Sequence, residues 1–355
     1  MKPQLIIDNI IIKEDMEDIY NRNIDWKSLN NTTIYVSGAY GMLASYLVLF
    51  LCYISEYKDI RVKIIAQGRN VEKMKKRFGD LFYKEYFYYT DENICMELKC
   101  TENIDYIIHA AGSSNPNLYS IKPVEIIEPN VLGTYYLLQL AKVKKSKGFL
   151  LFSTGDVYGE VDDSLYIDED TIGKVNQMDD HSCYSESKRM AETLAYFFLK
   201  EYAVSTKIVR IGHTYGPTMD IENDPRVFSS FFKCLINKSN IEILSDGTSR
   251  RPFCYLADAI AAYFTVLLYG ENGKAYNICN NHEFLSITEF ANIVANLRDG
   301  VNVVYKKRNL SDEYVENVVN HDNLLSDKRL KELGFEYHYT TEEGIKRVYN
   351  YISNC

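Results

Sequence analysis

Near its N-terminus the chain reads Thr33-Ile34-Tyr35-Val36-Ser37-Gly38-Ala39-Tyr40-Gly41-Met42-Leu43-Ala44, which is the pattern of a strand, a glycine turn and a helix. Residues 34–36 form a short β-prone run, and an apolar helical stretch follows the two glycines. Between a strand and a helix, the first glycine permits a tight turn and the second lets the backbone approach a pyrophosphate. The helix N-terminus then offers N–H groups and a positive dipole end to phosphate oxygens.

The glycine turn therefore predicts a dinucleotide site in which Gly38, Gly41, Met42 and Leu43 contact the cofactor. The same spacing also occurs in ordinary tight turns between a strand and a helix, so the surrounding sequence has to decide between the two interpretations.

Strands and helices alternate after this turn. Strands are expected at residues 62–66, 106–109, 148–153 and 206–211, and helices at residues 71–78, 124–142 and 185–201. Strands separated by helices of this length form a parallel sheet with right-handed crossovers and helices on both faces. The sequence therefore predicts the α/β class, with a doubly wound parallel (Rossmann) sheet and a smaller mixed C-terminal substrate lobe.

The expected organisation has three parts. Residues 1–31 are an N-terminal extension that packs across the main domain, residues 32–216 form the dinucleotide-binding domain, and residues 217–355 form the smaller lobe. Part of residues 250–280 is a candidate to complete the large sheet. In the smaller lobe, Ser286 and Glu289 have the spacing of a capping box for a helix over residues 287–297.

Composition argues against several classes of protein. The formal net charge is −9 and no long Lys/Arg run is present, so a nucleic-acid partner is not expected. The longest apolar stretch, Met42 to Ile54, is too short to span a bilayer and no signal peptide precedes it, so no membrane partner is expected either. The eight cysteines form no Cys-x-x-Cys pair, which argues against a metal site and against disulfides, and which favours a cytoplasmic location.

The end of the second expected strand departs from the usual dinucleotide pattern. An acid there normally holds the ribose hydroxyls, whereas this chain reads Ala66-Gln67-Gly68-Arg69-Asn70. Arg69 can stack on adenine or pair with a 2′-phosphate, and it can equally be a solvated surface residue. Asp91, after the next strand, is a candidate contact to the adenine edge. NAD is the expected cofactor, with NADP left open.

Tyr184 and Lys188 are four residues apart and therefore lie on one face of a helix. A phenol has a reference pKa of about 10. A neighbouring ammonium and an oxidised nicotinamide both favour the phenolate, which makes Tyr184 a candidate base. Thr154 ends a strand, where a hydroxyl can point into the ligand crevice. Taken alone, the Tyr184–Lys188 spacing also fits an ordinary helix surface, and Thr154 alone also fits an ordinary turn at the end of a strand.

Together these residues resemble the extended short-chain dehydrogenase/reductases of the nucleotide-sugar epimerase, dehydratase and decarboxylase group, in the same order over residues 32 to 350. The resemblance includes His109-Ala110-Ala111-Gly112, Pro123-Val124-Glu125, Asn130-Val131-x-Gly133-Thr134, Arg210-x-x-His213-x-Tyr215-Gly216-Pro217 and Arg251-Pro252-Phe253-Cys254-Tyr255-Leu256-x-Asp258. It implies a nucleotide-diphosphate sugar as substrate. It also implies a homodimer that pairs through a four-helix bundle made by helices 124–142 and 184–201.

The resemblance also implies roles for individual residues. Thr154, Tyr184 and Lys188 act on the sugar C4 hydroxyl, and Asp156 acts as a base or selects the substituent at C5. Tyr184 and Lys188 also contact the cofactor, together with Ala110, Ala111 and Gly112 on the nicotinamide side. Arg226 and Arg251 meet the diphosphate, since guanidinium forms paired hydrogen bonds with phosphate oxygens. The remaining expected substrate contacts are Ser113, Asn115, His213 and Tyr255.

The fate of the 4-keto sugar depends on residues 154–156, which read Thr154-Gly155-Asp156. A 4,6-dehydratase of the family has an acid at the middle position, and glycine offers none. Decarboxylation of the UDP-glucuronate type and epimerisation are therefore expected about equally, ahead of 4,6-dehydration or simple 4-dehydrogenation. A non-catalytic dinucleotide-binding protein is the distant alternative, and it is disfavoured because Thr154, Tyr184 and Lys188 are all present.

Overall fold

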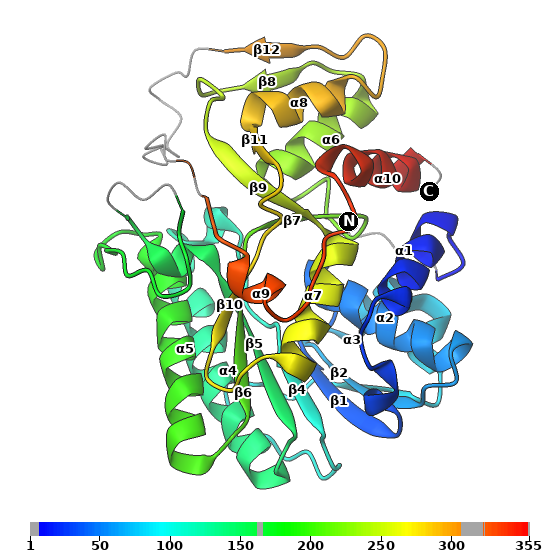
Figure 1. Ribbon diagram of the computed structural model, residues 1–355, viewed down its shortest axis with the longest axis vertical. Helices are drawn as coiled ribbons and strands as arrows, with labels where there is room; N and C mark the ends of the chain where they lie inside the picture. The colour runs from blue at the N-terminus through cyan, green and yellow to red at the C-terminus, as the bar shows by residue number, and fades with distance from the viewer. Residues whose placement is uncertain (1–6, 162–165, 307–321, 323, 354–355) are drawn as a thin grey trace.

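The computed structural model describes residues 7–161, 166–306, 322 and 324–353. Its centre is a seven-stranded parallel sheet in the order β10-β6-β5-β4-β1-β2-β3 (Figure 1). The strands are β1 Thr32–Ser37, β2 Val62–Gln67, β3 Phe87–Thr90, β4 Tyr106–His109, β5 Gly148–Thr154, β6 Thr206–Ile211 and β10 Ala275–Ile278. The strand order reverses between β1 and β4, and ligands bind at such a switch point, beyond the carboxyl ends of the strands.

Helices cover both faces of this sheet, which confirms the predicted doubly wound fold. One face carries α2 Met42–Tyr57, α3 Val71–Phe78 and α7 Leu256–Tyr269, and the other carries α4 Pro123–Lys144 and α5 Ser182–Tyr202. Successive strand residues point to opposite faces. In β5, Leu150 and Phe152 accordingly join the core under α2 and α7, whereas Phe149 and Leu151 join the core under α4 and α5.

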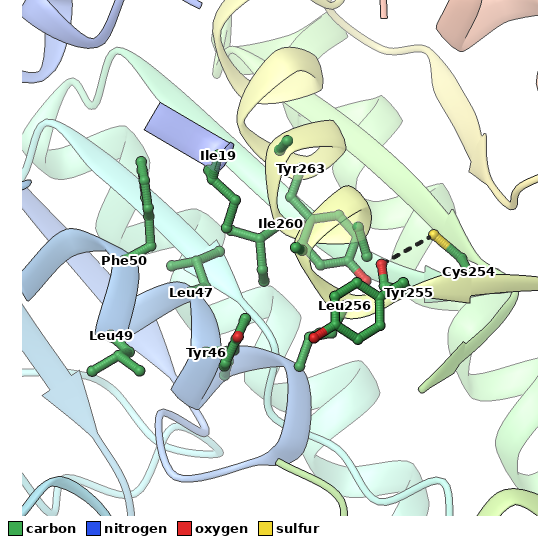
Figure 2. Packing of buried hydrophobic residues seen from close by; sticks show 14 of the residues in the cluster. Ile19, Tyr46, Leu47, Leu49, Phe50, Cys254, Tyr255, Leu256, Ile260 and Tyr263 are labelled. Atoms are coloured by element: carbon green, nitrogen blue, oxygen red, sulfur yellow. Dashed lines mark hydrogen bonds between the residues drawn. The ribbon is translucent and has the colours of Figure 1, made fainter. Parts of the chain in front are cut away.

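The apolar stretch that opens α2 forms a buried core helix. Every residue from Ala44 to Ile54 is buried. Figure 2 shows Leu47 and Phe50 of α2 facing Ile260 of α7 and Ile19 of the N-terminal segment. Among the helices that the structure describes, none is long and apolar enough to cross a membrane.

A smaller mixed lobe packs on the carboxyl edge of the large sheet (Figure 1). Its strands are β7 His213–Tyr215, β9 Arg250–Tyr255 and β11 Phe284–Ser286 in one sheet and β8 Ile241–Ile243 with β12 Val303–Tyr305 in another. Its helices are α6 Val227–Asn237, α8 Ile287–Ala295 and α10 Thr341–Ser353, with the short α9 Lys328–Lys331 near β10. Ser286 and Glu289 form the predicted capping box at the start of α8.

Short 3-10 helices occupy several connections. They are η1 Trp26–Leu29, η2 Gly79–Tyr83, η3 Pro116–Leu118 and η4 Gly155–Tyr158. Two of them matter for function, because η3 follows β4 and η4 follows β5 at the carboxyl edge of the sheet.

The N-terminal segment forms a helix that the sequence analysis did not predict, α1 Ile10–Asn21. The Asn9 side chain accepts hydrogen bonds from the backbone of Ile11 and Ile12, which caps the first turn. Ile12, Met16 and Ile19 are fully buried, and their spacing places them on one face of the helix. This face packs against α2, α7 and α10.

A buried carboxylate, Asp15, joins α1 to both lobes. It accepts hydrogen bonds from Tyr46 of α2, from Tyr255 at the end of β9 (2.6 Å) and from Arg347 of α10 (2.7 Å). The Asp15 side chain has no exposed surface. The Asp15 carboxylate therefore joins the large sheet to the smaller lobe. Its burial is favourable only because Tyr46, Tyr255 and Arg347 donate hydrogen bonds to it.

Removing the cation at this junction should lower stability. Replacement of Arg347 by Met leaves the Asp15 carboxylate buried without its cation, which typically costs about 3 kcal/mol. The neighbouring Lys346 pairs with Glu342 at the surface, so Lys346→Met should leave the free energy of unfolding almost unchanged. Urea unfolding followed by circular dichroism measures both values. Equal midpoints for the two variants would contradict the proposed strength of the junction.

Candidate active site

The glycine turn between β1 and α2 closes tightly against the end of β4. Gly38 has φ of +67°, and a Cβ atom there would lie 2.8 Å from the Cα of Ala111. Only glycine fits this close backbone approach. Gly41 precedes the first turn of α2, so the N–H groups at Met42 and Leu43 lie at the carboxyl edge of β1. The turn thus has the form that a pyrophosphate requires.

Ser37 and His109 fix the end of β4 beside this turn. The Ser37 Oγ accepts hydrogen bonds from the backbone N–H groups of Ala110 and Ala111 (3.1 Å each) and contacts His109 Nδ1 at 2.8 Å. Burial, and then the charge of Lys188, lowers the pKa of His109 to about 3, so the ring is neutral. Because the Pro129 carbonyl can only accept, His109 Nε2 donates to it and Nδ1 accepts from Ser37.

Gln67 lies at the end of β2, where dinucleotide-binding domains usually carry an acid. Its Oε1 accepts from the Gly38 N–H (3.1 Å) and its Nε2 donates to the Glu92 carbonyl (2.9 Å). The side chain therefore supports the glycine turn. Arg69 and Asp91 are both exposed, just beyond the carboxyl ends of the neighbouring strands β2 and β3.

Thr154, Tyr184 and Lys188 come together at the carboxyl end of β5. Thr154 is the last residue of β5, and its hydroxyl is hydrogen-bonded to the Tyr184 phenol. The Lys188 ammonium donates to the Phe152 carbonyl at 2.7 Å and lies 6.0 Å from the centre of the Tyr184 ring. All three side chains are buried.

Gly112 links this group to the glycine turn. A Cβ atom on Gly112 would lie 3.6 Å from Lys188 Nζ and 2.7 Å from Asn130 Oδ1. The loop of residues 110–112 thus touches Gly38 at one end and Lys188 at the other. The structure therefore places the phosphate-type turn and the Tyr–Lys pair on one continuous surface.

The electrostatics of Tyr184 differ from the sequence-based expectation. Burial raises the pKa of Tyr184 well above its usual value, and the Asp156 carboxylate raises it further. The hydrogen bond from Thr154 and the charge of Arg226 lower this pKa, whereas the Lys188 ammonium is directed to a strand carbonyl. Burial lowers the pKa of Lys188 to about 8, against the raising effect of Glu192.

Three of the expected substrate contacts, His213, Arg226 and Arg251, belong to the same electrostatic group as this phenol. Arg226, before the first turn of α6, pairs with Asp224 (2.5 Å), and its charge also acts on Tyr184. Burial and the charge of Arg251 lower the pKa of His213 to about 3, and Asp156 and Arg226 act on the same ring. Asp156, Arg226 and Arg251 therefore lie within electrostatic range of the His213 ring, and Asp156 and Arg226 also act on Tyr184.

Other expected substrate residues have local partners. Asn115 caps η3 by accepting from the Asn117 N–H (3.1 Å), and Ser113 Oγ accepts from the Asn115 N–H (3.3 Å). Tyr255 lies apart from the group, because its buried hydroxyl donates to Asp15. We therefore leave Tyr255 out of the site. Its partner is 240 residues away in the sequence, which no local pattern reveals.

Two residues at the site were missed as candidates by sequence reasoning. Tyr119 stacks on Tyr184, with ring centres 5.5 Å apart and planes 15° from parallel. Asn130 donates to Ser187 (2.9 Å), while its buried Oδ1 beside Gly112 has no hydrogen-bond partner within the described part of the chain. Asn130 lay in a motif of the family resemblance, which was the available signal.

Comparisons with known proteins agree with this arrangement. The family model "NAD dependent epimerase/dehydratase family" matches residues 34–279. UDP-glucuronic acid decarboxylases 5 and 3 of Arabidopsis thaliana are 32% identical over 269 and 268 residues, which cover 76% and 75% of this chain and 75% of each relative.

Solved structures share the fold. A UDP-glucose 4-epimerase from Thermotoga maritima, crystallised with UDP-glucose, has a TM-score of 0.75 at 20% identity. A UDP-glucuronic acid 4-epimerase from Bacillus cereus, in complex with UDP-glucuronic acid and NAD, has a TM-score of 0.74 at 20% identity. Each match covers 91% of this chain and 99% of the other.

The close approach at Gly38 can be tested with a matched pair of substitutions. Gly38→Ala forces the loop at Ala111 away from the turn, so dinucleotide affinity should fall roughly tenfold or more. Gly334 also has a positive φ, of +82°, but no heavy atom lies within 4 Å of its Cβ position, so Gly334→Ala should bind as the parent does. Titration calorimetry with NAD measures both. Unchanged binding by Gly38→Ala would show that the turn is not the cofactor site.

Proposed function

Because the chain belongs to the NAD-dependent epimerase/dehydratase family, we propose that it binds NAD and oxidises the sugar C4 hydroxyl of a nucleotide-diphosphate sugar. The observation that best supports this proposal is the continuous surface from Gly38 through residues 110–112 to Lys188. On that surface a dinucleotide held at the glycine turn extends to the Tyr184 phenol.

The residues of this surface fit the cofactor from end to end. Gly38, Gly41 and the first turn of α2 suit the pyrophosphate, and Ala110, Ala111 and Gly112 suit the nicotinamide side. Arg69 and Asp91 remain candidates for the adenosine end. When bound, NAD accepts a hydride from the sugar carbon and can return it.

Tyr184 and Thr154 act on the oxygen at C4. Thr154 donates a hydrogen bond that steadies this oxygen, and Tyr184 takes its proton as the carbonyl forms. The free protein holds Tyr184 in its neutral form. The positive charge of Arg226 and that of an oxidised nicotinamide both favour the phenolate, so bound cofactor and substrate prepare the base.

We further propose that the 4-keto sugar loses CO₂, as in a UDP-glucuronate decarboxylase. A β-keto acid loses CO₂ readily once C4 is oxidised, so this route needs no acid at Gly155. The relatives at 32% identity are named UDP-glucuronic acid decarboxylases. Arg226, Arg251 and the neutral His213 form a site that suits an anionic diphosphate and a uronate carboxylate.

Epimerisation at C4 is the second candidate. Gly155 places no side chain beside Thr154, and a 4-epimerase needs none there. The two reactions differ in mass, because epimerisation leaves the mass of the nucleotide sugar unchanged.

Products from a panel of UDP-, dTDP-, GDP- and CDP-sugars, followed by mass spectrometry, test the proposal. We expect UDP-glucuronate to lose the mass of CO₂, and Tyr184→Phe to lower this turnover by roughly a hundredfold or more while NAD still binds. Tyr83→Phe, at an exposed tyrosine away from the site, is the matched control. A product of unchanged mass would indicate epimerisation instead of decarboxylation, and a product that has lost water would indicate dehydration. Full turnover by Tyr184→Phe would reject the proposed oxidation at C4.

We also propose a homodimer in the cytoplasm. Helices α4 and α5 pack side by side and expose apolar side chains, namely Val124, Ile127, Leu132, Tyr135, Met190, Tyr196, Phe197 and Tyr202. The same two helices from a second copy would complete a four-helix bundle and bury this surface. The cytoplasmic location agrees with the free thiols of the seven cysteines in the described residues.

Analytical ultracentrifugation tests the dimer. The parent protein should sediment as a dimer, and Phe197→Glu should shift it to monomer because a carboxylate would be buried in the bundle. Tyr83 is also exposed but lies on η2, near β3 at the opposite edge of the sheet, so Tyr83→Glu should leave the dimer intact. A monomeric parent protein would refute the proposed bundle.

A further inference from the structure

A second polar pair lies beside the C4 group. Asp156 on η4 and His181, immediately before α5, approach each other with Oδ2 and Nε2 3.3 Å apart. Both side chains are 41% exposed, so the pair reaches solvent, whereas Thr154 and Tyr184 are buried. The C4 oxidation described above uses neither His181 nor its contact with Asp156.

Several contacts fix this pair relative to the reacting group. The Asp156 N–H donates to Thr154 Oγ1 (3.2 Å), and the His181 ring meets Tyr119 edge-on with centres 5.0 Å apart. Tyr119 in turn stacks on Tyr184. The backbone N–H of His181 is held by Asp179 (2.8 Å). In the proposed function the sugar C4 oxygen lies at Thr154 and Tyr184, so C5, the next ring carbon, would lie on the side of this pair.

Proton balance in the proposed decarboxylation requires a group of this kind. The C4 hydroxyl gives its proton to Tyr184, and that proton returns to the C4 oxygen at the end. Between these steps the C5–C6 bond breaks, CO₂ leaves, and the bonding electron pair moves through C5 to the C4 oxygen as an enolate. C5 must then take up one additional proton, so the overall reaction consumes one proton from solvent.

The other titratable groups of the site are poorly suited to this delivery. Lys188 is hydrogen-bonded to the Phe152 carbonyl and lies beside Gly112, on the cofactor side. His213 is neutral, since burial and Arg251 lower its pKa to about 3. Arg226 and Arg251 keep their protons at all working pH values. Among the described carboxylates and histidines near Tyr184, Asp156 and His181 form a hydrogen-bonded pair that is also accessible to solvent.

We propose that His181 and Asp156 form a proton path that carries one solvent proton to C5 of the enolate. The inference rests on the proposed function, and it adds the source of the second proton. The His181 imidazolium gives its proton to the Asp156 carboxylate, and the Asp156 carboxylic acid gives it to C5. Solvent then restores the imidazolium. His181 acts through Asp156 and does not contact the sugar.

The stereochemistry of protonation tests this path. With UDP-glucuronate in D₂O, the parent protein should place one deuterium in one of the two positions at C5 of the product, as read by NMR. His181→Ala should lower kcat by roughly tenfold to a hundredfold with a smaller change in KM, and should scatter deuterium over both positions. Added imidazole should restore rate and stereochemistry. His181→Gln provides a second variant with a polar side chain, which should show the same defects.

His282→Ala is the matched control, because the His282 ring packs near Tyr337 and has no contact with Asp156 among the described interactions. Parent-like kcat and single-position labelling in both His181 variants would overturn the proton path. A loss of activity that imidazole does not restore, with labelling still at one position, would also overturn it. If the parent protein itself releases no CO₂, the proposed function fails instead, so the two failures are distinguishable.

Discussion

The Lys188 ammonium lies buried at the carboxyl end of β5, where it donates a hydrogen bond to the Phe152 carbonyl. Removing an ammonium from water costs several kcal/mol, and burial accordingly lowers the pKa of Lys188 to about 8. A helix that only needed to cover the sheet would place an apolar residue there. The contact holds α5 against β5, so Tyr184, one turn earlier on the same helix, meets Thr154. Burying the Lys188 ammonium therefore lowers the stability of the fold, and in return the Tyr184 phenol is fixed beside Thr154 at the end of β5.

The cofactor side depends on a different constraint, which is close backbone packing without side chains. Gly38 lies against Ala111, and Gly112 lies against Lys188 and Asn130. Ser37 links these parts, since its Oγ binds both the loop after β4 and the neutral His109. The smaller lobe then adds the positive charges of Arg226 and Arg251, which both act on the buried His213. Helix α1, through Asp15, joins that lobe to α2 and so helps to keep the two sides of the site together.

Much of this arrangement follows from local sequence patterns, because each strand–turn–helix unit carries its own periodicity. The parallel sheet, the glycine turn and the common helix face of Tyr184 and Lys188 are of this kind. What the sequence did not reveal depends on long-range partners. Helix α1 was missed because a polar residue such as Asp15 does not look buried in the sequence. Its partner Arg347, which lets it be buried, lies 332 residues later. Tyr255 was expected at the site from the family resemblance, and its hydrogen bond to Asp15 is a tertiary contact that no local pattern reveals. The bond from Lys188 to the Phe152 carbonyl is a tertiary contact of the same kind.

In the proposed reaction Tyr184 holds the proton of the C4 hydroxyl, and NAD, when bound, would take the hydride from C4 and return it to the same sugar. UDP-glucuronate with deuterium at C4, converted in ordinary water and analysed by NMR, measures this most directly. If the hydride returns, the product retains the deuterium at C4. Deuterium that appears in water, or a product that carries hydrogen at C4, would contradict the proposed reaction.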